Sequence, residues 1–265
     1  MGEVIVITSG KGGVGKTTVT ANLSVSLSLL GKKVIAIDTD IGLRNLDVVM
    51  GLENSIVYNI VDVIEGNCRL KQAIIRDKRF RNLYLLPSAQ SKDKSCINQY
   101  QMINLTNELK QKFDYVLIDC PAGIEQGFKN AIAGATRAII VTTPEVSAIR
   151  DADRVSCLLD KAGLYPINLI VNKIRNDLVK KGDMMSTDDV TEILSLDLIG
   201  MIHDDTDIVI STNRGEPLAG ANSYSSKIFM NIAKRIDGEE VPILNHKNRK
   251  FNFFKKYLTG GFQNV

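Results

Sequence analysis

The sequence predicts an α/β protein with a doubly wound, mostly parallel β-sheet and helices on both faces of the sheet. Short runs of aliphatic and β-branched residues recur along the 265-residue chain, and stretches long enough for helices separate them. The runs are apolar almost throughout rather than alternating, which is typical of strands covered on both faces. Strands are expected at residues 4–8, 33–38, 82–87, 115–119, 138–144, 167–172 and 198–202, and helices at 16–30, 96–112, 146–162 and 223–236.

Residues 1–238 are expected to form one domain, and residues 239–265 a flexible linker with a separate terminal segment. Gly238, Glu239, Glu240 and Pro242 end the last helical stretch, and the composition changes after them. An apolar fraction of 44% with 24% charged residues is ordinary for a globular protein and excludes global disorder. The four cysteines lie too far apart for a short-spaced zinc or redox pair.

The first expected strand leads into a glycine-rich loop that predicts a nucleotide site. Gly10, Gly15, Lys16 and Thr17 fit the pattern G-x-x-x-x-G-K-S/T between a strand and a helix, a context that a chance glycine-rich turn would lack. Glycines let backbone N–H groups surround phosphates, Lys16 neutralises their charge and the Thr17 hydroxyl reaches Mg²⁺. The residues expected to bind the nucleotide here are Gly10, Lys11, Gly12, Gly13, Val14, Gly15, Lys16, Thr17 and Thr18.

Carboxylates follow two other expected strands and predict a place for the metal. Phosphoryl transfer in such folds needs an acid near the magnesium, at the end of a neighbouring apolar strand. Asp119 closes one such strand, and Asp38 and Asp40 lie at the end of another. We expect Asp119 to serve the metal, while the residues alone do not rank Asp38 against Asp40.

The chain ends in a basic segment with an aromatic face. Residues 241–265 contain five basic residues and no acidic one, whereas the first 240 contain 28 basic and 30 acidic residues. At 100° per residue, residues 249–258 would form an amphipathic helix that should fold on a surface able to bury its apolar side. The charge suggests an anionic partner, either a membrane or nucleic acid, and the aromatic face favours an anionic membrane. The alternative is that the aromatic side chains pack on the protein's own core. The membrane residues would be Phe251, Phe253, Phe254, Tyr257 and Leu258, with Lys255 and Lys256 on the opposite face.

The loop KGGVGKTT, with its additional lysine at position 11, resembles the deviant Walker A motif of the MinD/ParA (SIMIBI) family of P-loop ATPases. That family also includes the nitrogenase iron protein and arsenite-pump ATPases. Further stretches resemble its members that place the bacterial division site, from residue 1 to about 238 and again in the tail. These stretches are DTDIGLRNLDVVMGL (38–52), VYNIVDVIEG (57–66), LPSAQSKDK (86–94), DCPAGIE (119–125) and TPEVSAIRDADR (143–154).

The resemblance implies a P-loop NTPase fold and roles for individual residues. Lys11 would cross the interface of an ATP-bound dimer to the phosphates of the opposite subunit, where a second cation stabilises developing charge beside Lys16. Asp40 would orient the attacking water, and Asp40 and Asp119 would each reach Mg²⁺ through a water. Asn172 would contact adenine, although a polar strand end explains it equally well.

The resemblance also implies a function. The chain would hydrolyse ATP to ADP and phosphate with Mg²⁺, dimerise with ATP, and bind the inner face of the cell membrane, or its plastid equivalent, from the cytoplasm. It would recruit the division inhibitor MinC and respond to MinE or another topological factor, so controlling where the septum forms. The expected docking helix begins near Glu145 and includes Arg150, Asp151 and Asp153. No specific nucleic acid is expected.

Two other functions fit the same loop. A ParA-type ATPase for DNA or plasmid segregation would need a basic patch on the body of the protein, whose first 240 residues carry a small negative net charge. An ATPase with a metal cluster would need paired cysteines across a dimer, and Cys120 is the candidate for one of them.

Overall fold

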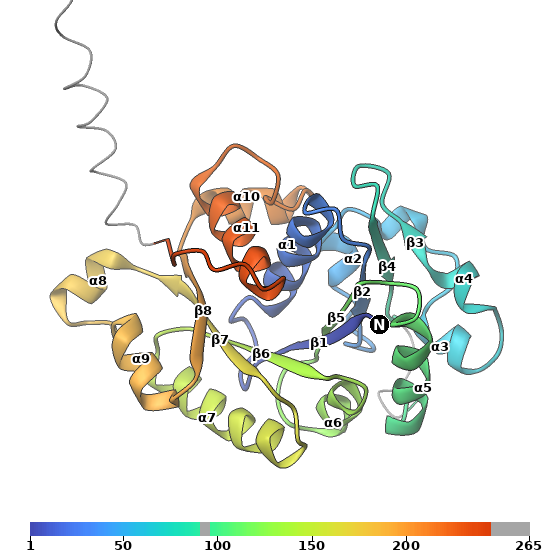
Figure 1. Cartoon of the computed structure of the whole chain (residues 1–265), viewed down its shortest axis with the longest axis horizontal. Coiled ribbons are helices and arrows are strands. Elements are labelled where there is room, and N and C mark those ends of the chain that lie inside the picture. Colours follow the sequence, from blue (N-terminus) through green and yellow to red (C-terminus); the bar gives the residue numbers. More distant parts are fainter. Residues whose placement is uncertain (91–95, 245–265) are drawn as a thin grey trace, which may run out of the picture.

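The computed structural model describes residues 1–90 and 96–244. These residues form an eight-stranded sheet in the order β3-β4-β2-β5-β1-β6-β7-β8, in which β3 runs antiparallel to β4 and the other neighbours pair in parallel (Figure 1). The strands are β1 (Glu3–Thr8), β2 (Val34–Asp38), β3 (Ile75–Arg76), β4 (Leu83–Leu86), β5 (Tyr115–Asp119), β6 (Arg137–Thr142), β7 (Ile167–Ile174) and β8 (Asp197–His203). The predicted fold class is confirmed.

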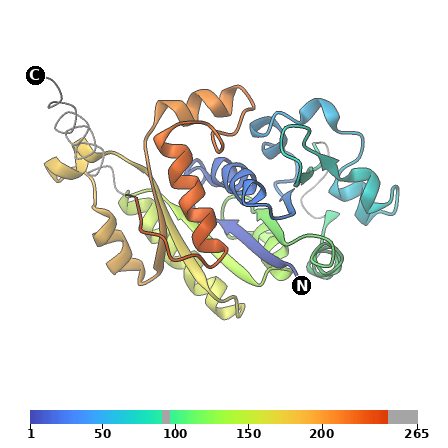
Figure 2. The same cartoon turned by 45° about the horizontal axis from the view of Figure 1, so that its top comes forward.

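Helices cover both faces of this sheet. In both views α1 and α11 lie side by side on one face, with α10 beside them, whereas α5, α6, α7 and α9 lie on the other (Figure 2). The helices are α1 (Lys16–Leu29), α2 (Leu46–Val49), α3 (Ile60–Ile64), α4 (Leu70–Ala73), α5 (Gln99–Leu109), α6 (Gln126–Ala133), α7 (Val146–Lys161), α8 (Asn176–Lys181), α9 (Thr187–Leu194), α10 (Thr206–Asn213) and α11 (Tyr224–Ile236), with a 3₁₀ turn at Glu53–Ser55.

The central strands divide their side chains between two hydrophobic cores. In β1, Val4 and Val6 pack into the core under α5, α6 and α7, while Ile5 and Ile7 pack into the core under α1 and α11. Successive side chains of a strand point to opposite faces, so a strand buried on both sides must be apolar at every position. This is the physical reason for the uninterrupted apolar runs in the sequence.

The expected strands and helices are found with small changes at their ends. The helix expected from residue 96 begins at Gln99, because the side chain of Asn98 accepts a hydrogen bond from the Gln101 amide at 3.0 Å and caps it. The strand β3 was missed: two residues, one of them the exposed Arg76, are too few to show a pattern.

The chain leaves α11 in an extended segment that stays against that helix. Arg235 Nε donates to the Val241 carbonyl at 3.0 Å, and Leu244 packs against the core beneath α11. The predicted membrane residues lie outside the described part of the chain: Phe251, Phe253, Phe254, Lys255, Lys256, Tyr257 and Leu258. Within the described residues, none of the helices combines the length and the apolar character needed to cross a membrane.

Candidate functional site

The glycine-rich loop lies between the carboxyl end of β1 and the start of α1, at the edge of the sheet where parallel strands present their loops. Gly15, the residue before α1, has φ +99°, a left-handed conformation that favours glycine. Gly10 packs directly against the backbone of Asp151 in α7, which leaves no space for a Cβ atom. The loop is therefore shaped by glycine at the positions where the sequence pattern requires it.

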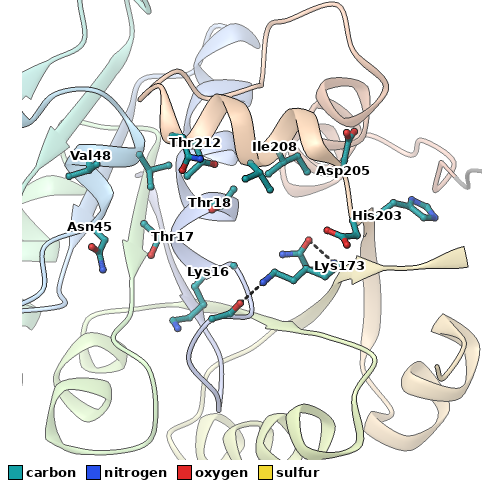
Figure 3. A pocket seen from close by; sticks show the side chains of 17 residues that line it. Lys16, Thr17, Thr18, Asn45, Val48, Lys173, His203, Asp205, Ile208 and Thr212 are labelled. Carbon is teal, nitrogen blue, oxygen red and sulfur yellow. Dashed lines mark hydrogen bonds between the residues drawn. The ribbon is translucent and has the colours of Figure 1, made fainter. Parts of the chain in front are cut away.

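A cavity of about 590 Å³ opens beside this loop, a size that suits a small-molecule ligand. Its walls come from four segments: the loop and the start of α1, the short helix α2, the end of β7, and the connection from β8 into α10 together with that helix (Figure 3). Of the residues predicted to bind the nucleotide, Gly13, Gly15, Lys16, Thr17, Thr18 and Asn172 line the cavity, whereas Gly10, Lys11, Gly12 and Val14 do not.

Asp119 closes β5 beneath the phosphate loop and is almost fully buried. Burial raises the pKa of its carboxyl group, and hydrogen bonding from Thr17 and the nearby charge of Lys16 oppose that shift. The Thr20 hydroxyl, one turn further along α1, donates to Asp119 Oδ1 at 3.2 Å. Sequence reasoning missed Thr20, because its contact depends on how α1 packs over β5. The carboxylate of Asp119 thus faces the first turn of α1.

Asp38 and Asp40 were both candidates for the acid near the metal, and the structure places them differently. Asp38 is buried, and its carboxylate accepts hydrogen bonds from the backbone amides of Asp40 at 2.9 Å and of Asn45 and Leu46 at 3.1 Å each. These bonds hold the loop that leads into α2. Burial and the neighbouring Asp119 raise the pKa of Asp38. Asp40 is half-buried at the start of the same loop. Asp38 therefore shapes the loop on which Asp40 lies.

Lys11 extends away from the cavity that Lys16 lines. Its Nζ atom donates to the Ser147 hydroxyl at 3.1 Å and lies 3.5 Å from Glu145 Oε2, both at the start of α7. The Lys11 side chain is 44% exposed. The two lysines of the loop thus serve different surfaces: Lys16 faces the cavity of its own chain, and Lys11 lies at the surface beside α7.

Asn172 connects the end of β7 to the phosphate loop. Its Nδ2 donates to the Val14 carbonyl at 2.8 Å, and its Oδ1 accepts from the Lys173 amide at 2.9 Å. Lys173, which sequence reasoning did not select, donates from Nζ to the Gly13 carbonyl at 2.8 Å. In this structure the Asn172 amide braces the loop, and the residue also borders the cavity. His203, given no role from the sequence, borders the cavity from β8.

The wall formed by α10 was also missed from the sequence. Ile208, Val209 and Thr212 face the cavity from this helix, which begins after the acidic residues Asp204 and Asp205. Acidic residues that follow an apolar strand were a usable signal, as at Asp119. The helix itself gave little signal, because its apolar residues, Ile208, Val209 and Ile210, are consecutive rather than spaced along one face.

The residues present suit a magnesium ion. Hard divalent cations prefer oxygen ligands. The Thr17 hydroxyl lies in the first turn of α1, Asp119 closes β5, and Asp40 lies on the loop that follows β2. Burial raises the pKa of both Asp38 and Asp119, and the charge of Asp119 raises that of Asp38 further. A cation bound at this point would relieve that repulsion.

Comparisons with known proteins agree on one family. Residues 2–161 match a family model described as an AAA domain. The septum site-determining protein MinD of Bacillus subtilis is 56% identical over 254 residues, which cover 94% of this chain and 95% of that protein. The MinC:MinD cell division complex of Aquifex aeolicus has a chain with a TM-score of 0.86 and 46% identity, over 92% of this chain and 99% of that one.

A further solved structure is MinD from Pyrococcus horikoshii in complex with Mg-ADP, with a TM-score of 0.82 and 34% identity over 90% of this chain and 97% of that one. Identity at these levels over nearly the whole chain, together with the phosphate loop and the parallel sheet, establishes the family. The chain belongs to the MinD family of septum site-determining proteins, ATP-binding P-loop ATPases of cell division within the MinD/ParA group.

Proposed function

We propose that the chain is an ATP-controlled switch that places the division septum by moving between a monomer and a membrane-bound dimer. The observation that carries this proposal is the position of the Lys11 side chain. It points away from the cavity of its own chain and lies at the surface beside α7. A cation in that position can reach the phosphates of a second subunit packed against this face. The loop would then sense dimerisation as well as ATP.

The chemistry proposed for the site is hydrolysis of ATP to ADP and phosphate. Thr17 would hold Mg²⁺ directly, and Asp119 and Asp40 would hold it through water. When bound, the ion supplies positive charge to the phosphate oxygens. Lys16 would neutralise the phosphates, Asp40 would orient the attacking water, and Asn172 would contact the adenine while it braces the loop.

Membrane binding is proposed for residues 249–258. Each lysine near an anionic surface contributes about 1 kcal/mol, so one copy of this segment is a weak anchor. Two copies in a dimer bind much more tightly, because binding of the first raises the effective concentration of the second. ATP would control membrane residence by controlling dimerisation, and the chain would move between the cytoplasm and the inner face of the membrane.

A partner such as MinC would be recruited by the dimer, as the Aquifex complex of MinC and MinD suggests. Along α7, Arg150 and Asp153 are exposed and Glu145 is exposed at its start, which suits docking. Asp151 is half-buried against the phosphate loop and is less suited to docking a partner. MinE or another topological factor would stimulate hydrolysis. The family assignment favours this function over the DNA-segregation and metal-cluster alternatives.

The test compares three full-length variants with the wild type in sedimentation with anionic vesicles, with ATP and with ADP. Phe254→Glu places a charge on the apolar face, and Phe262→Glu makes the same change outside residues 249–258 as the matched control. Lys11→Ala removes the cation proposed to act across the dimer. We expect ATP-dependent binding by the wild type and Phe262→Glu, and its loss in Phe254→Glu and Lys11→Ala.

Analytical ultracentrifugation of the same samples without vesicles separates the two parts of the proposal. Lys11→Ala should remain monomeric with ATP, whereas Phe254→Glu should dimerise like the wild type. An ATP-bound Lys11→Ala dimer of wild-type affinity would contradict the role of Lys11. Equal membrane binding by Phe254→Glu and the wild type would contradict the role of the terminal segment.

A further inference from the structure

Two walls of the nucleotide cavity are short helices that meet at their carboxyl ends. Asn45 and Val48 line the cavity from the α2 side, and Ile208 and Thr212 line it from α10 (Figure 3). Each helix ends in a glycine with φ +64°, Gly51 after α2 and Gly215 after α10. A Cβ atom on Gly215 would lie 2.7 Å from the Gly51 Cα atom, so the two turns touch backbone to backbone.

Arg79, from the turn between β3 and β4, joins these two helix ends. Its Nη1 donates to the Gly215 carbonyl at 2.9 Å, and its Nη2 donates to the Met50 carbonyl at the end of α2. Carbonyl groups at the end of a helix carry partial negative charge and lack helical partners, so a cation there is favourable. The planar guanidinium can donate to both helices at once, which an ammonium group cannot do with the same geometry.

Asp77 fixes the direction in which Arg79 points. Its buried carboxylate accepts from Arg79 Nη2 at 2.7 Å and from Nε at 3.2 Å, and it also accepts from the Arg79 backbone amide at 2.7 Å. A paired carboxylate of this kind preorganises the guanidinium before it meets the two helix ends. None of these residues lines the cavity, so their effect on a ligand must pass through α2 and α10.

We propose that Arg79 is a positioning residue for nucleotide binding, which holds the ends of α2 and α10 together from outside the cavity and so sets the separation of its two walls. The inference rests on the proposed nucleotide site. The phosphate loop itself belongs to β1 and α1 and receives no bond from Arg79 in the described structure. A ligand that spans both walls should depend on Arg79, and one that fills the phosphate loop alone should not.

The test measures dissociation constants for Mg-ADP and for Mg-pyrophosphate by calorimetry on the full chain. Losing hydrogen bonds from a charged donor to both walls should raise the dissociation constant of ADP about tenfold in Arg79→Ala. The constant for pyrophosphate should change by less than about twofold, because it needs only the phosphate loop. Arg79→Lys keeps the charge but cannot donate to both helix ends with the geometry of a guanidinium, so its ADP affinity should fall between those of the wild type and Arg79→Ala.

Arg76→Ala is the matched control, since it removes an arginine of the same hairpin whose Nε donates to the Arg81 carbonyl rather than to either wall. It should bind both ligands like the wild type. Unchanged ADP affinity in Arg79→Ala would overturn the inference, and so would a parallel loss for ADP and pyrophosphate, which would mean that Arg79 supports the fold as a whole. If Arg79→Ala does not fold, Arg79→Lys decides by the same comparison: its dissociation constant should rise for ADP and not for pyrophosphate. A wild type that fails to bind ADP would instead refute the proposed function.

Discussion

Carboxyl groups lie at both ends of the central strands, and their surroundings are opposite. Near the amino end of β5, burial would raise the pKa of Asp237, but a hydrogen bond from Lys32 at 2.8 Å and one from the Tyr115 hydroxyl at 2.9 Å outweigh it, so the pKa is lowered. At the carboxyl end, Asp38 and Asp119 occupy paired positions on neighbouring strands, and both pKa values are raised.

The opposite pKa shifts distinguish the amino end of the strands, where the carboxyl group stabilises the fold, from the carboxyl end, where the ligand would bind. At the amino end each charge is offset by a partner on the same chain, which stabilises the folded state. At the carboxyl end burial disfavours the ionisation of both acids, and the charge of Asp119 also disfavours that of Asp38. The fold retains this unfavourable pair where phosphate and magnesium would bind. A bound Mg²⁺ would be attracted to both carboxylates and would offset the repulsion between them.

The largest expected effect comes from removing one acid of the pair. Asp119→Asn should weaken the binding of Mg-ADP at least tenfold. It should also raise the free energy of unfolding of the nucleotide-free protein by about 1 kcal/mol, because a neutral amide of the same shape ends the repulsion of Asp38. Calorimetry with Mg-ADP and chemical denaturation measure the two quantities.

The matched control for Asp119→Asn is Asp237→Asn, the same substitution at the other end of the strands. It should lower the free energy of unfolding and leave nucleotide affinity unchanged, because it removes the partner of Lys32 and Tyr115. If Asp119→Asn destabilises the free protein as much as Asp237→Asn does, the contrast between the two ends is wrong.

The pH dependence of stability gives a smaller effect of definite sign. The pKa of Asp38 is raised from 3.8 to about 7, so its contribution to stability is fully present below about pH 4 and is lost as pH rises through about 7. Between pH 5 and 8 the loss of this contribution should lower the free energy of unfolding of the nucleotide-free wild type by about 2 kcal/mol.

Asp38→Asn should flatten that decline, as urea unfolding at several pH values would show. Asp237→Asn should keep the wild-type slope in this range, because the pKa of Asp237 is lowered and its contribution is lost only as pH falls below about 4. An Asp38→Asn variant with the wild-type slope would show that the decline does not come from the titration of Asp38.

The amino-acid sequence predicts the parts of this site that are local. The phosphate loop follows from one continuous stretch with a strand before it and a helix after it, and the apolar strands follow from burial on both faces. The sequence could not choose between Asp38 and Asp40, because the choice depends on which carboxylate turns back to the amides of Asn45 and Leu46.

Contacts between distant segments stayed outside the reach of sequence reasoning. The register that sets Asp38 beside Asp119 joins strands about 80 residues apart, and the bond from Arg79 to Gly215 spans 136 residues. Both depend on the order of strands in the sheet and on helix ends that meet only after folding. The predicted roles of Lys11 and the terminal segment remain predictions, which the Lys11 and Phe254 variants above address. The role of Asp40 also remains a prediction.

The smallest expected effect tests whether the two ends of β5 are independent. Tyr115→Phe removes the hydroxyl that donates to Asp237 and leaves Lys32 as its partner, so the free energy of unfolding should fall by about 1 kcal/mol. Tyr100→Phe, at an exposed position on α5, removes the same hydroxyl from a solvated ring and should change stability by much less. Denaturation curves of the two variants measure the difference.

Nucleotide affinity supplies the decisive comparison for Tyr115→Phe. Tyr115 begins β5 and Asp119 ends it, and the buried apolar residues Val116, Leu117 and Ile118 lie between them. With no polar link along the strand, a loss of one hydrogen bond at the amino end should leave the affinity for Mg-ADP unchanged. A reduced affinity in Tyr115→Phe, with none in Tyr100→Phe, would mean that the strand transmits strain from its amino end to Asp119, and the site would then depend on the packing of the whole sheet.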